Sequence, residues 1–393
     1  MLCTTLAAAA FSLNSNFSST ELEEMSKRGG SPPTEGTLVK RARATPPPSK
    51  QIAISSSNDE RSKGLIRTVK RTSSLEAPII SLAGAHSAEI LSCRFDPTGQ
   101  NIAACSADRS VSFWRTYPPN SNYGLLSNFS KAPILDLQWS LCSPTLYTVA
   151  ADHTLCLTDV TTGHRIRKIR AHREIINSVD RTMAGGAGTE LVATGSDDGT
   201  VKIWEGGEEG GKQAVATFDI GCPVTSVCWG ADGANVYIGA LDNEIHVYDL
   251  RKSQQVYTLT GHSDTPTSLA LSPNGNYLLS PSFSSHTIIH DIRPFSSSPT
   301  RIHRVLQGAP AGFENTLLRG AWSKDDEGRR VAVGGADRAV CIWDVDSGKI
   351  LYKLPGHKGT VTSVDFHPKE PIILTGSKDG TMILGEIESG VKV

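Results

Sequence analysis

The chain has 393 residues, of which 38% are hydrophobic and 20% charged, and its formal net charge is −1 at pH 7. This composition is typical of a globular protein, and the near-zero charge argues against a wholly basic nucleic-acid binder. No run of about 18 apolar residues is present, so the sequence predicts no membrane span.

Residues 1–75 are rich in Ser, Pro and Gly and carry no hydrophobic periodicity. Such a segment buries too little apolar surface to offset the entropy of ordering a chain, which predicts a disordered tail. Its first residues are apolar but lack the basic flank of a secretion signal. Our hypothesis is that Met25 is the working start and that residues 1–24 are an upstream extension.

The second half of this tail is basic. Between Leu38 and Leu75, nine Lys or Arg oppose two acidic residues, a local balance of +7. Lys40, Arg41 and Arg43, close to a run of three prolines, resemble a short nuclear-import signal and predict a location in the nucleus. The alternative interpretation is a solvated basic linker.

From Glu76 onward, short strand-like runs alternate with turns rich in Gly, Pro, Asn and Asp. The clearest hairpin is Leu191–Glu205, in which an apolar run and an alternating run flank the turn GSDDG. Equivalent turn positions recur at intervals of 44, 46, 44, 42, 53 and 42 residues. They are Asp108, Asp152, Asp198, Asp242, Ser284, Asp337 and Asp379.

A period in the forties with four strands per unit is the signature of WD repeats. It predicts an all-β fold, a seven-bladed WD40 β-propeller over residues 76–390. No unit can bury both faces alone, so the ring must close. The extended segment Ala77–Ala83 precedes the first unit. We therefore expect it to supply the outer strand of the last blade.

Within a WD unit, a His, a strand Ser or Thr, the turn Asp and a Trp form a hydrogen-bonded chain that satisfies every buried polar atom. At the expected spacings only the third unit has all four, which are His172, Thr194, Asp198 and Trp204. We predict structural support rather than a hydrolase triad, because the grouping recurs in successive units at fixed spacing to a Trp. The other units keep part of the set, namely His86, Asp108, Trp114, Asp152, Asp242, His262, Asp337, Trp343, His357 and Asp379.

Some units depart from the pattern. The first has Ala104 at the hydroxyl position, and the seventh has Gly385 in place of the Trp. The fifth departs most, with Ser284 for the turn Asp and His290 for the Trp. We expect the fifth blade to be locally the weakest.

Two patterns hint at chemistry. His286 and His290 would share one face of a strand, but no Cys or carboxylate set accompanies them to complete a metal site. Gly206–Gln213 nearly matches a phosphate-binding loop, but Gln213 replaces the Mg²⁺-binding hydroxyl and a strand-like run follows. The eight cysteines form no C-x-x-C pair and are expected to be buried thiols. We expect no enzymatic activity, no cofactor, no metal and no small-molecule substrate.

Several stretches resemble one group of WD proteins, the 40-kDa WD-repeat family of the U5 small nuclear ribonucleoprotein. The likeness covers about residues 73–388. It is carried by Ser73–His86, Ala193–Trp204, Gly275–Ser280, Phe313–Ser323, Ile350–His357 and the ending GEIE at Gly385–Glu388.

This resemblance implies a non-catalytic scaffold in the nucleus that acts in pre-mRNA splicing. It implies docking on the large U5 core protein, near the U5 helicase and the U5 GTPase. Contact with small nuclear RNA would be mainly indirect, and the protein would be a monomer within the larger complex. A rival interpretation comes from Tyr248–Arg251 and His290–Arg293, which resemble the W-D-x-R ending of WD substrate receptors of cullin-type ubiquitin ligases.

The longest interval between turn positions contains Arg293–Phe313. Inserted surface loops often carry binding function, so we rank this segment first as a docking loop. Its candidate contact residues are Arg293, Pro294, Phe295, Arg301, Arg304 and Phe313.

Overall fold

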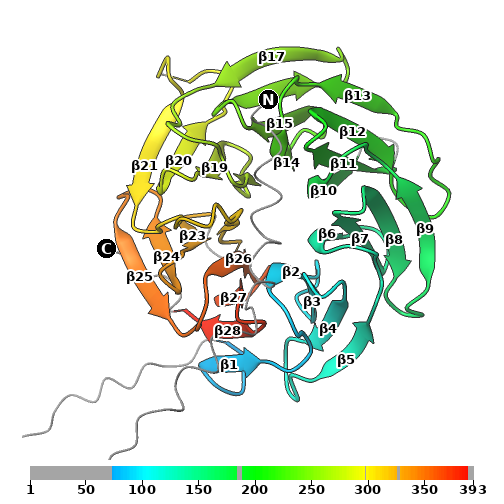
Figure 1. The fold of residues 1–393 in the computed structure, drawn as a ribbon. Coiled ribbons are helices and arrows are strands. Elements are labelled where there is room, and N and C mark those ends of the chain that lie inside the picture. Colours follow the sequence, from blue (N-terminus) through cyan, green and yellow to red (C-terminus); the bar gives the residue numbers. More distant parts are fainter. Residues whose placement is uncertain (1–72, 184–187, 297, 325–327, 388–393) are drawn as a thin grey trace, which may run out of the picture. The chain divides into compact units, whose positions relative to one another are not determined.

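The computed structural model describes residues 73–183, 188–296, 298–324 and 328–387. Its strands form seven four-stranded sheets, and no helix occurs among the described residues. The sheets stand as blades around a central axis (Figure 1), which confirms the predicted seven-bladed propeller. Residues 1–72 of the predicted tail, with Met25 and the import residues Lys40, Arg41 and Arg43, lie outside the described residues. The last three residues of that segment are described, and Leu75 is buried in the core, so the boundary at residue 75 was set too late. No described helix could cross a membrane.

The first four blades follow the chain from the axis outward. Blade 1 has β2 (Ile90–Phe95), β3 (Asn101–Ser106), β4 (Val111–Arg115) and β5 (Asn122–Leu126). Blade 2 has β6 (Ile134–Trp139), β7 (Thr145–Ala150), β8 (Thr154–Asp159) and β9 (Arg165–Arg170). Blade 3 has β10 (Ile176–Met183), β11 (Glu190–Ser196), β12 (Thr200–Glu205) and β13 (Ala216–Asp219). Blade 4 has β14 (Val224–Trp229), β15 (Asn235–Ala240), β16 (Ile245–Asp249) and β17 (Gln254–Leu259).

The last three blades complete the ring. Blade 5 has β18 (Ala270–Leu271), β19 (Tyr277–Pro281), β20 (His286–Asp291) and β21 (Ile302–Gln307). Blade 6 has β22 (Gly320–Trp322), β23 (Arg330–Gly334), β24 (Ala339–Asp344) and β25 (Ile350–Pro355). Blade 7 has β26 (Val361–Phe366), β27 (Ile372–Ser377), β28 (Met382–Glu386) and, outermost, β1 (Ile79–Leu82).

Blade 7 is therefore built from two distant parts of the chain. β1 runs antiparallel to β28, from the pair Ile79 and Gly385 to the pair Leu82 and Met382. Just before β1, the Ser73 N–H donates to Glu386 Oε1 over 2.9 Å. The ring is thus closed by a backbone ladder that continues into side-chain contacts.

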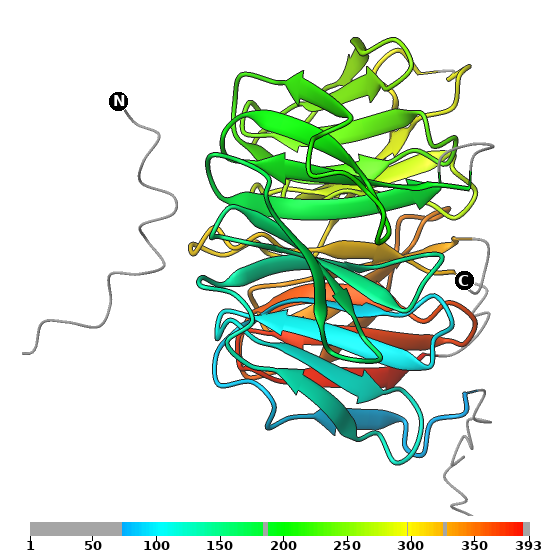
Figure 2. The same ribbon diagram turned by 90° about the vertical axis from the view of Figure 1, so that its right-hand side faces the viewer.

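The hydrophobic core lies between blades rather than within them. At the closing interface, Ile90 and Trp114 of blade 1 pack with Ile372 and Leu384 of blade 7. Six further clusters of the described residues occupy the other interfaces in the same way. Each blade buries its faces only against its neighbours, and Figure 2 shows the blades stacked side by side in edge view.

The inner strands share an irregularity. The ladders of β2, β6, β10, β14 and β26 each shift register after the first residue of the strand, as at a β-bulge. A bulge changes the directions of the side chains around it. In three blades the first residue after the register shift lines the central cavity; these residues are Asp136, Ser178 and Ser226.

The closing ladder leads to a first prediction. A chain that begins at Ser73 keeps β1, whereas one that begins at Ala85 lacks it. We expect the shorter chain to melt at a temperature lower by roughly 10 °C or more, because the edge of β28 is uncovered and the buried side chain of Leu82 is lost from the core. Thermal unfolding followed by circular dichroism measures this. Equal melting temperatures would contradict the role of β1.

Candidate functional site

The predicted polar set of blade 3 is brought together. His172 Nε2 lies 2.8 Å from Thr194 Oγ1, and Trp204 Nε1 donates to the same oxygen over 2.9 Å. His172 Nδ1 lies 3.0 Å from Asp198 Oδ2. Burial lowers the pKa of His172, although the Asp198 carboxylate acts to raise it. The ring is therefore neutral, and it can donate from Nδ1 to the carboxylate and accept the Thr194 hydroxyl at Nε2.

Asp198 ties two loops together. Besides His172, it accepts hydrogen bonds from the Arg173 N–H at 3.0 Å and from Thr200 Oγ1 at 2.6 Å. Burial alone would raise the pKa of Asp198, but these hydrogen bonds and His172 lower it to about 2. The hydroxyl that contacts His172 Nε2 belongs to Thr194, which is 0% exposed. A nucleophile there could not reach a substrate, so the geometry favours structural support.

Blade 1 corrects the expectation that only blade 3 has a complete set. Ala104 supplies no hydroxyl, but Ser112 stands directly opposite it on β4. Ser112 Oγ lies 2.7 Å from His86 Nε2 and accepts from Trp114 Nε1 over 2.9 Å. Asp108 completes the network at 3.1 Å from His86 Nδ1. The hydroxyl comes from the neighbouring strand because the two positions face each other in register.

In blades 2 and 6, where the His is missing, a lysine pairs with the turn Asp. Lys168 Nζ lies 2.9 Å from Asp152 in blade 2, and Lys353 Nζ lies 2.6 Å from Asp337 in blade 6. Both lysines follow their Asp by 16 residues. That shared spacing is visible in the sequence, although the pairing was not predicted from it.

Blades 4, 6 and 7 differ in detail. In blade 4, His246 of β16 approaches Asp242 to 2.8 Å. In blade 7, His357 lies 2.8 Å from Thr375 Oγ1 and 3.4 Å from Asp379. In blade 6, Trp343 Nε1 donates to the backbone oxygen of Gln307 in the adjacent blade over 3.0 Å.

In blade 5, two histidines have buried ring nitrogens without a hydrogen-bond partner among the described residues. His262 Nε2 lies 2.6 Å from Ser280 Oγ, but its Nδ1 has no partner among the described residues, because Ser284 replaces the Asp. His290 is 0% exposed, and neither ring nitrogen has a hydrogen-bond partner in the described part of the chain. Burial lowers the pKa of His262 to about 4 and that of His290 to about 3. Both rings are therefore neutral near pH 7.

Two groups of side chains contain residue types that can bind a metal. His286, the other half of the suggested His pair, lies 2.9 Å from Ser284 O and 3.1 Å from Gln307. The ligand atoms of Cys222, Asp242 and His246 lie within 4.8 Å of one another. However, Asp242 and His246 are only 2.8 Å apart, closer than the roughly 3.3 Å between tetrahedral zinc ligands at about 2.0 Å. Burial also raises the pKa of the Cys222 thiol, which disfavours a thiolate ligand.

The near-match to a phosphate-binding loop, Gly206–Gln213, connects β12 with β13. The element that follows it is a strand, so no helix N-terminus is present to receive a phosphate. This connection therefore has the character of an ordinary loop between strands.

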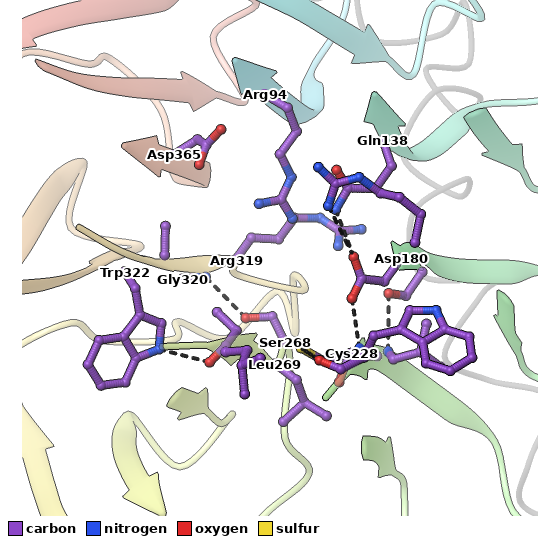
Figure 3. Close-up of a pocket in the computed structure, with 18 of the residues that line it drawn as sticks. Arg94, Gln138, Asp180, Cys228, Ser268, Leu269, Arg319, Gly320, Trp322 and Asp365 are labelled. Atoms are coloured by element: carbon purple, nitrogen blue, oxygen red, sulfur yellow. Dashed lines mark hydrogen bonds and ion pairs between the residues drawn. The ribbon is translucent and has the colours of Figure 1, made fainter. Parts of the chain in front are cut away.

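A cavity of about 620 Å³ lies among the inner strands of the ring (Figure 3). Arg319, at the start of blade 6, reaches across it and lies 3.0 Å from Asp136 of blade 2. The same guanidinium donates to the backbone oxygens of Leu135 at 3.1 Å and Asn177 at 3.0 Å. Arg319 thus links blade 6 to blades 2 and 3, which are not its neighbours.

The segment Arg293–Phe313 is not the single loop that the sequence suggested. It contains β21, so its two loops leave opposite ends of an outer strand. Phe295 is 96% exposed in the loop before β21, and Phe313 is fully exposed in the loop after it. A six-residue strand spans about 20 Å, so these two side chains lie on different faces of the ring.

The arginines of this segment are held by the protein. Arg293 binds Asp291 with Nε at 2.9 Å and Nη2 at 2.7 Å. Arg301 donates to the backbone oxygen of Arg293 over 2.8 Å, and Arg304 donates to that of Asp346. Pro294 lies beside Phe295 in the exposed part of the loop. Among the six candidate residues, the two phenylalanines expose almost their entire side chains.

Comparison with known proteins agrees with this architecture. Residues 77–115, 163–205, 213–249, 253–299 and 348–384 match the family described as WD domain, G-beta repeat. The U5 small nuclear ribonucleoprotein 40 kDa protein of Dictyostelium discoideum is 39% identical over 358 residues, which is 90% of this chain and 97% of that protein. The chain belongs to this U5 40 kDa family of WD-repeat proteins.

Other members of the U5 40 kDa family match over similar lengths. The human U5 small nuclear ribonucleoprotein 40 kDa protein is 39% identical over 81% of this chain and 86% of its own length. The pre-mRNA-splicing factor cwf17 of Schizosaccharomyces pombe is 38% identical over 90% of this chain and 97% of its own length. The resemblance stated from the sequence is therefore confirmed.

A second prediction concerns the relocated hydroxyl of blade 1. Ser112→Ala should lower the free energy of unfolding by about 1–3 kcal/mol, because His86 Nε2 and Trp114 Nε1 lose their shared partner. Adding Ala104→Thr places a hydroxyl at the position that Thr194 holds in blade 3 and should restore part of the loss. Urea unfolding of the two single variants and the double variant measures the coupling. Purely additive losses would contradict the assignment.

A third prediction concerns the neutral histidines of blade 5. The folded-state pKa of His290 is about 3, below the 6.5 of a free His. The unfolded chain therefore binds a proton more readily than the folded one, so the free energy of unfolding is fully retained above pH 6.5 and falls as the pH drops from 6.5 toward 3. At pH 5 this loss is about 2 kcal/mol for His290. The combined change His290→Trp and Ser284→Asp should reduce the difference in stability between pH 7 and pH 5. The exposed His164→Gln is the control, and an unchanged pH dependence of the double variant would contradict the analysis.

Proposed function

We propose that the chain is a non-catalytic interaction scaffold of the U5 small nuclear ribonucleoprotein, acting in pre-mRNA splicing in the nucleus. The observation that carries this is its 39% identity to a U5 40 kDa protein over nearly the full length of that relative. The blade networks support it, because their His and Asp side chains are engaged in bonds that hold loops and strands together. A buried group used in this way is not free to act on a substrate.

The proposed docking partner is the large U5 core protein, with the U5 helicase and the U5 GTPase nearby. A monomer in a larger complex would contact these partners through its exposed loops, and small nuclear RNA would be held mainly by the partners. Phe295 and Phe313 are the strongest anchors for such contacts, because both are almost fully exposed and aromatic residues, Phe among them, are enriched in the cores of protein interfaces. Their positions on opposite faces would allow two partners to bind at once.

The rival function, a substrate receptor of a cullin-type ubiquitin ligase, rests on the strand endings at Tyr248–Arg251 and His290–Arg293. In the second of these, Arg293 is paired with Asp291 through two hydrogen bonds. Binding an adaptor through that guanidinium would require breaking this pair. This cost favours the splicing scaffold.

A fourth prediction tests the proposed scaffold. The tagged full-length chain, expressed in cells, should recover the large U5 core protein and U5 RNA from nuclear extract, and no cullin adaptor. Phe295→Ala or Phe313→Ala should reduce that recovery about tenfold or more, because truncating an interface hot spot costs about 2 kcal/mol or more. The variant that fails identifies the docking face.

The matched control is Leu125→Ala, which removes a 47% exposed apolar side chain from the outer strand of blade 1. It should leave recovery unchanged. Recovery of a cullin adaptor without U5 components would overturn the proposed function. Full recovery with both phenylalanine variants would overturn the assignment of the docking residues.

A further inference from the structure

The central cavity carries an unequal set of charges. Its lining includes three carboxylates and four cationic side chains. They are Asp136, Asp180 and Asp365 against Arg94, Arg181, Arg319 and Lys324. Among the described lining residues, one positive charge therefore remains without a carboxylate of its own.

The carboxylates are already engaged by the wall of the ring. Asp136 accepts from Arg319 and from the Val179 N–H, each at 3.0 Å. Asp180 accepts from the Trp229 N–H at 2.8 Å and from Gln138 at 3.2 Å. These bonds join inner strands of different blades and hold the carboxylates in place.

Asp365 is engaged in the same way. It accepts from the Phe95 N–H at 2.9 Å, which joins blade 7 to blade 1, and Lys324 approaches it to 3.4 Å. Lys324 is thus the cation nearest to Asp365, as Arg319 is to Asp136. Arg181, for its part, lies 3.8 Å from Asp180.

Arg94 is the cation left over. Its side chain reaches from β2 into the middle of the cavity (Figure 3), and it makes no hydrogen bond or ion pair with the described residues. Burial opposes its charge, but the three carboxylates outweigh this and raise the pKa of the guanidinium. Arg94 is therefore charged, and its donors are unused within the described part of the chain.

Other donors on the same wall are also unused. Trp229 Nε1, Ser226 Oγ and Arg319 Nε are buried and have no hydrogen-bond partner in the described part of the chain. A cavity with surplus donors and a surplus positive charge is complementary to a ligand that brings acceptors and a negative charge.

We propose that this cavity binds a carboxylate side chain from an acidic peptide segment of a partner protein, with Arg94 as its anchor. A carboxylate can accept two parallel hydrogen bonds from one guanidinium, and a single carboxylate matches the single unpaired charge. A nucleic-acid strand fits less well, because its successive phosphates would also approach Asp180 and Asp365. The cavity volume of about 620 Å³ lies within the roughly 300–1,000 Å³ of ligand sites.

The opening of the cavity indicates how a peptide would enter. Ala231, in the turn between β14 and β15, and Pro273, in the turn between β18 and β19, both belong to its lining. These turns lie at the same end of the strands as the loop that carries Phe295, because the first and third strands of a blade run in the same direction. Trp229, Leu271 and Trp322 offer apolar wall for the rest of the segment. The inference does not depend on the proposed role in splicing.

The test uses the full chain and a fluorescein-labelled penta-glutamate peptide, with binding followed by fluorescence anisotropy. Arg94→Gln should weaken binding at least tenfold, whereas Arg170→Gln, an exposed arginine on β9, should leave it unchanged. Penta-glutamine should bind at least tenfold more weakly than penta-glutamate. Equal binding by Arg94→Gln and the unaltered chain, or by the two peptides, would overturn the proposal.

A second pair of variants covers the case in which Arg94→Gln does not fold. Ala231 is exposed at the mouth, so Ala231→Glu and Ala231→Gln should both keep the melting temperature. Only the Glu variant should weaken binding of penta-glutamate, by several-fold. Equal effects of the two variants would overturn the proposal, as would tighter binding of a labelled oligouridylate than of penta-glutamate.

Discussion

Ring closure is the constraint on which the rest of this structure depends. Every hydrophobic cluster lies between two blades, so a blade that loses a neighbour loses half of its core. The ladder between β1 and β28 is therefore the point at which a row of seven sheets becomes a stable molecule. Because that ladder joins the two ends of the propeller sequence, the ring is complete only when the last strand has formed.

Within the ring, the turn carboxylates impose the second constraint. A partly buried Asp needs a compensating partner, and the chain provides one from three different places. A loop His serves Asp198, a Lys on the outer strand serves Asp152, and a His on the third strand serves Asp242. Degenerate WD repeats can therefore keep the geometry of the turn while losing the residues by which the repeat is usually recognised.

The sequence was sufficient for the fold because spacing encodes it. The turn positions from Asp108 to Asp379 repeat at the length of a blade, and that is enough to predict the number of sheets. Ser112 could not be found by spacing from the turn, because its role depends on standing opposite Ala104 in the strand register. β21 was missed because only Leu306 of its six side chains is buried, which leaves little hydrophobic pattern in the sequence.

The central cavity could not be predicted from the sequence. Arg94, Asp180 and Asp365 belong to three inner strands that lie far apart in the chain, and only the closed ring brings them together. The family assignment could be made earlier because it rests on short contiguous stretches such as Ala193–Trp204. Local stretches thus predicted the family, whereas contacts between blades required the structure.

The bridge from Arg319 to Asp136 has a mechanical consequence. It joins two blades that are separated by three interfaces along the shorter path around the ring, and so acts as a brace across the circle. A closed ring without a brace can be flattened into an oval by a force applied at its rim. With the brace, flattening the ring along the line from blade 6 to blade 2 requires breaking this buried ion pair as well as bending the blade interfaces.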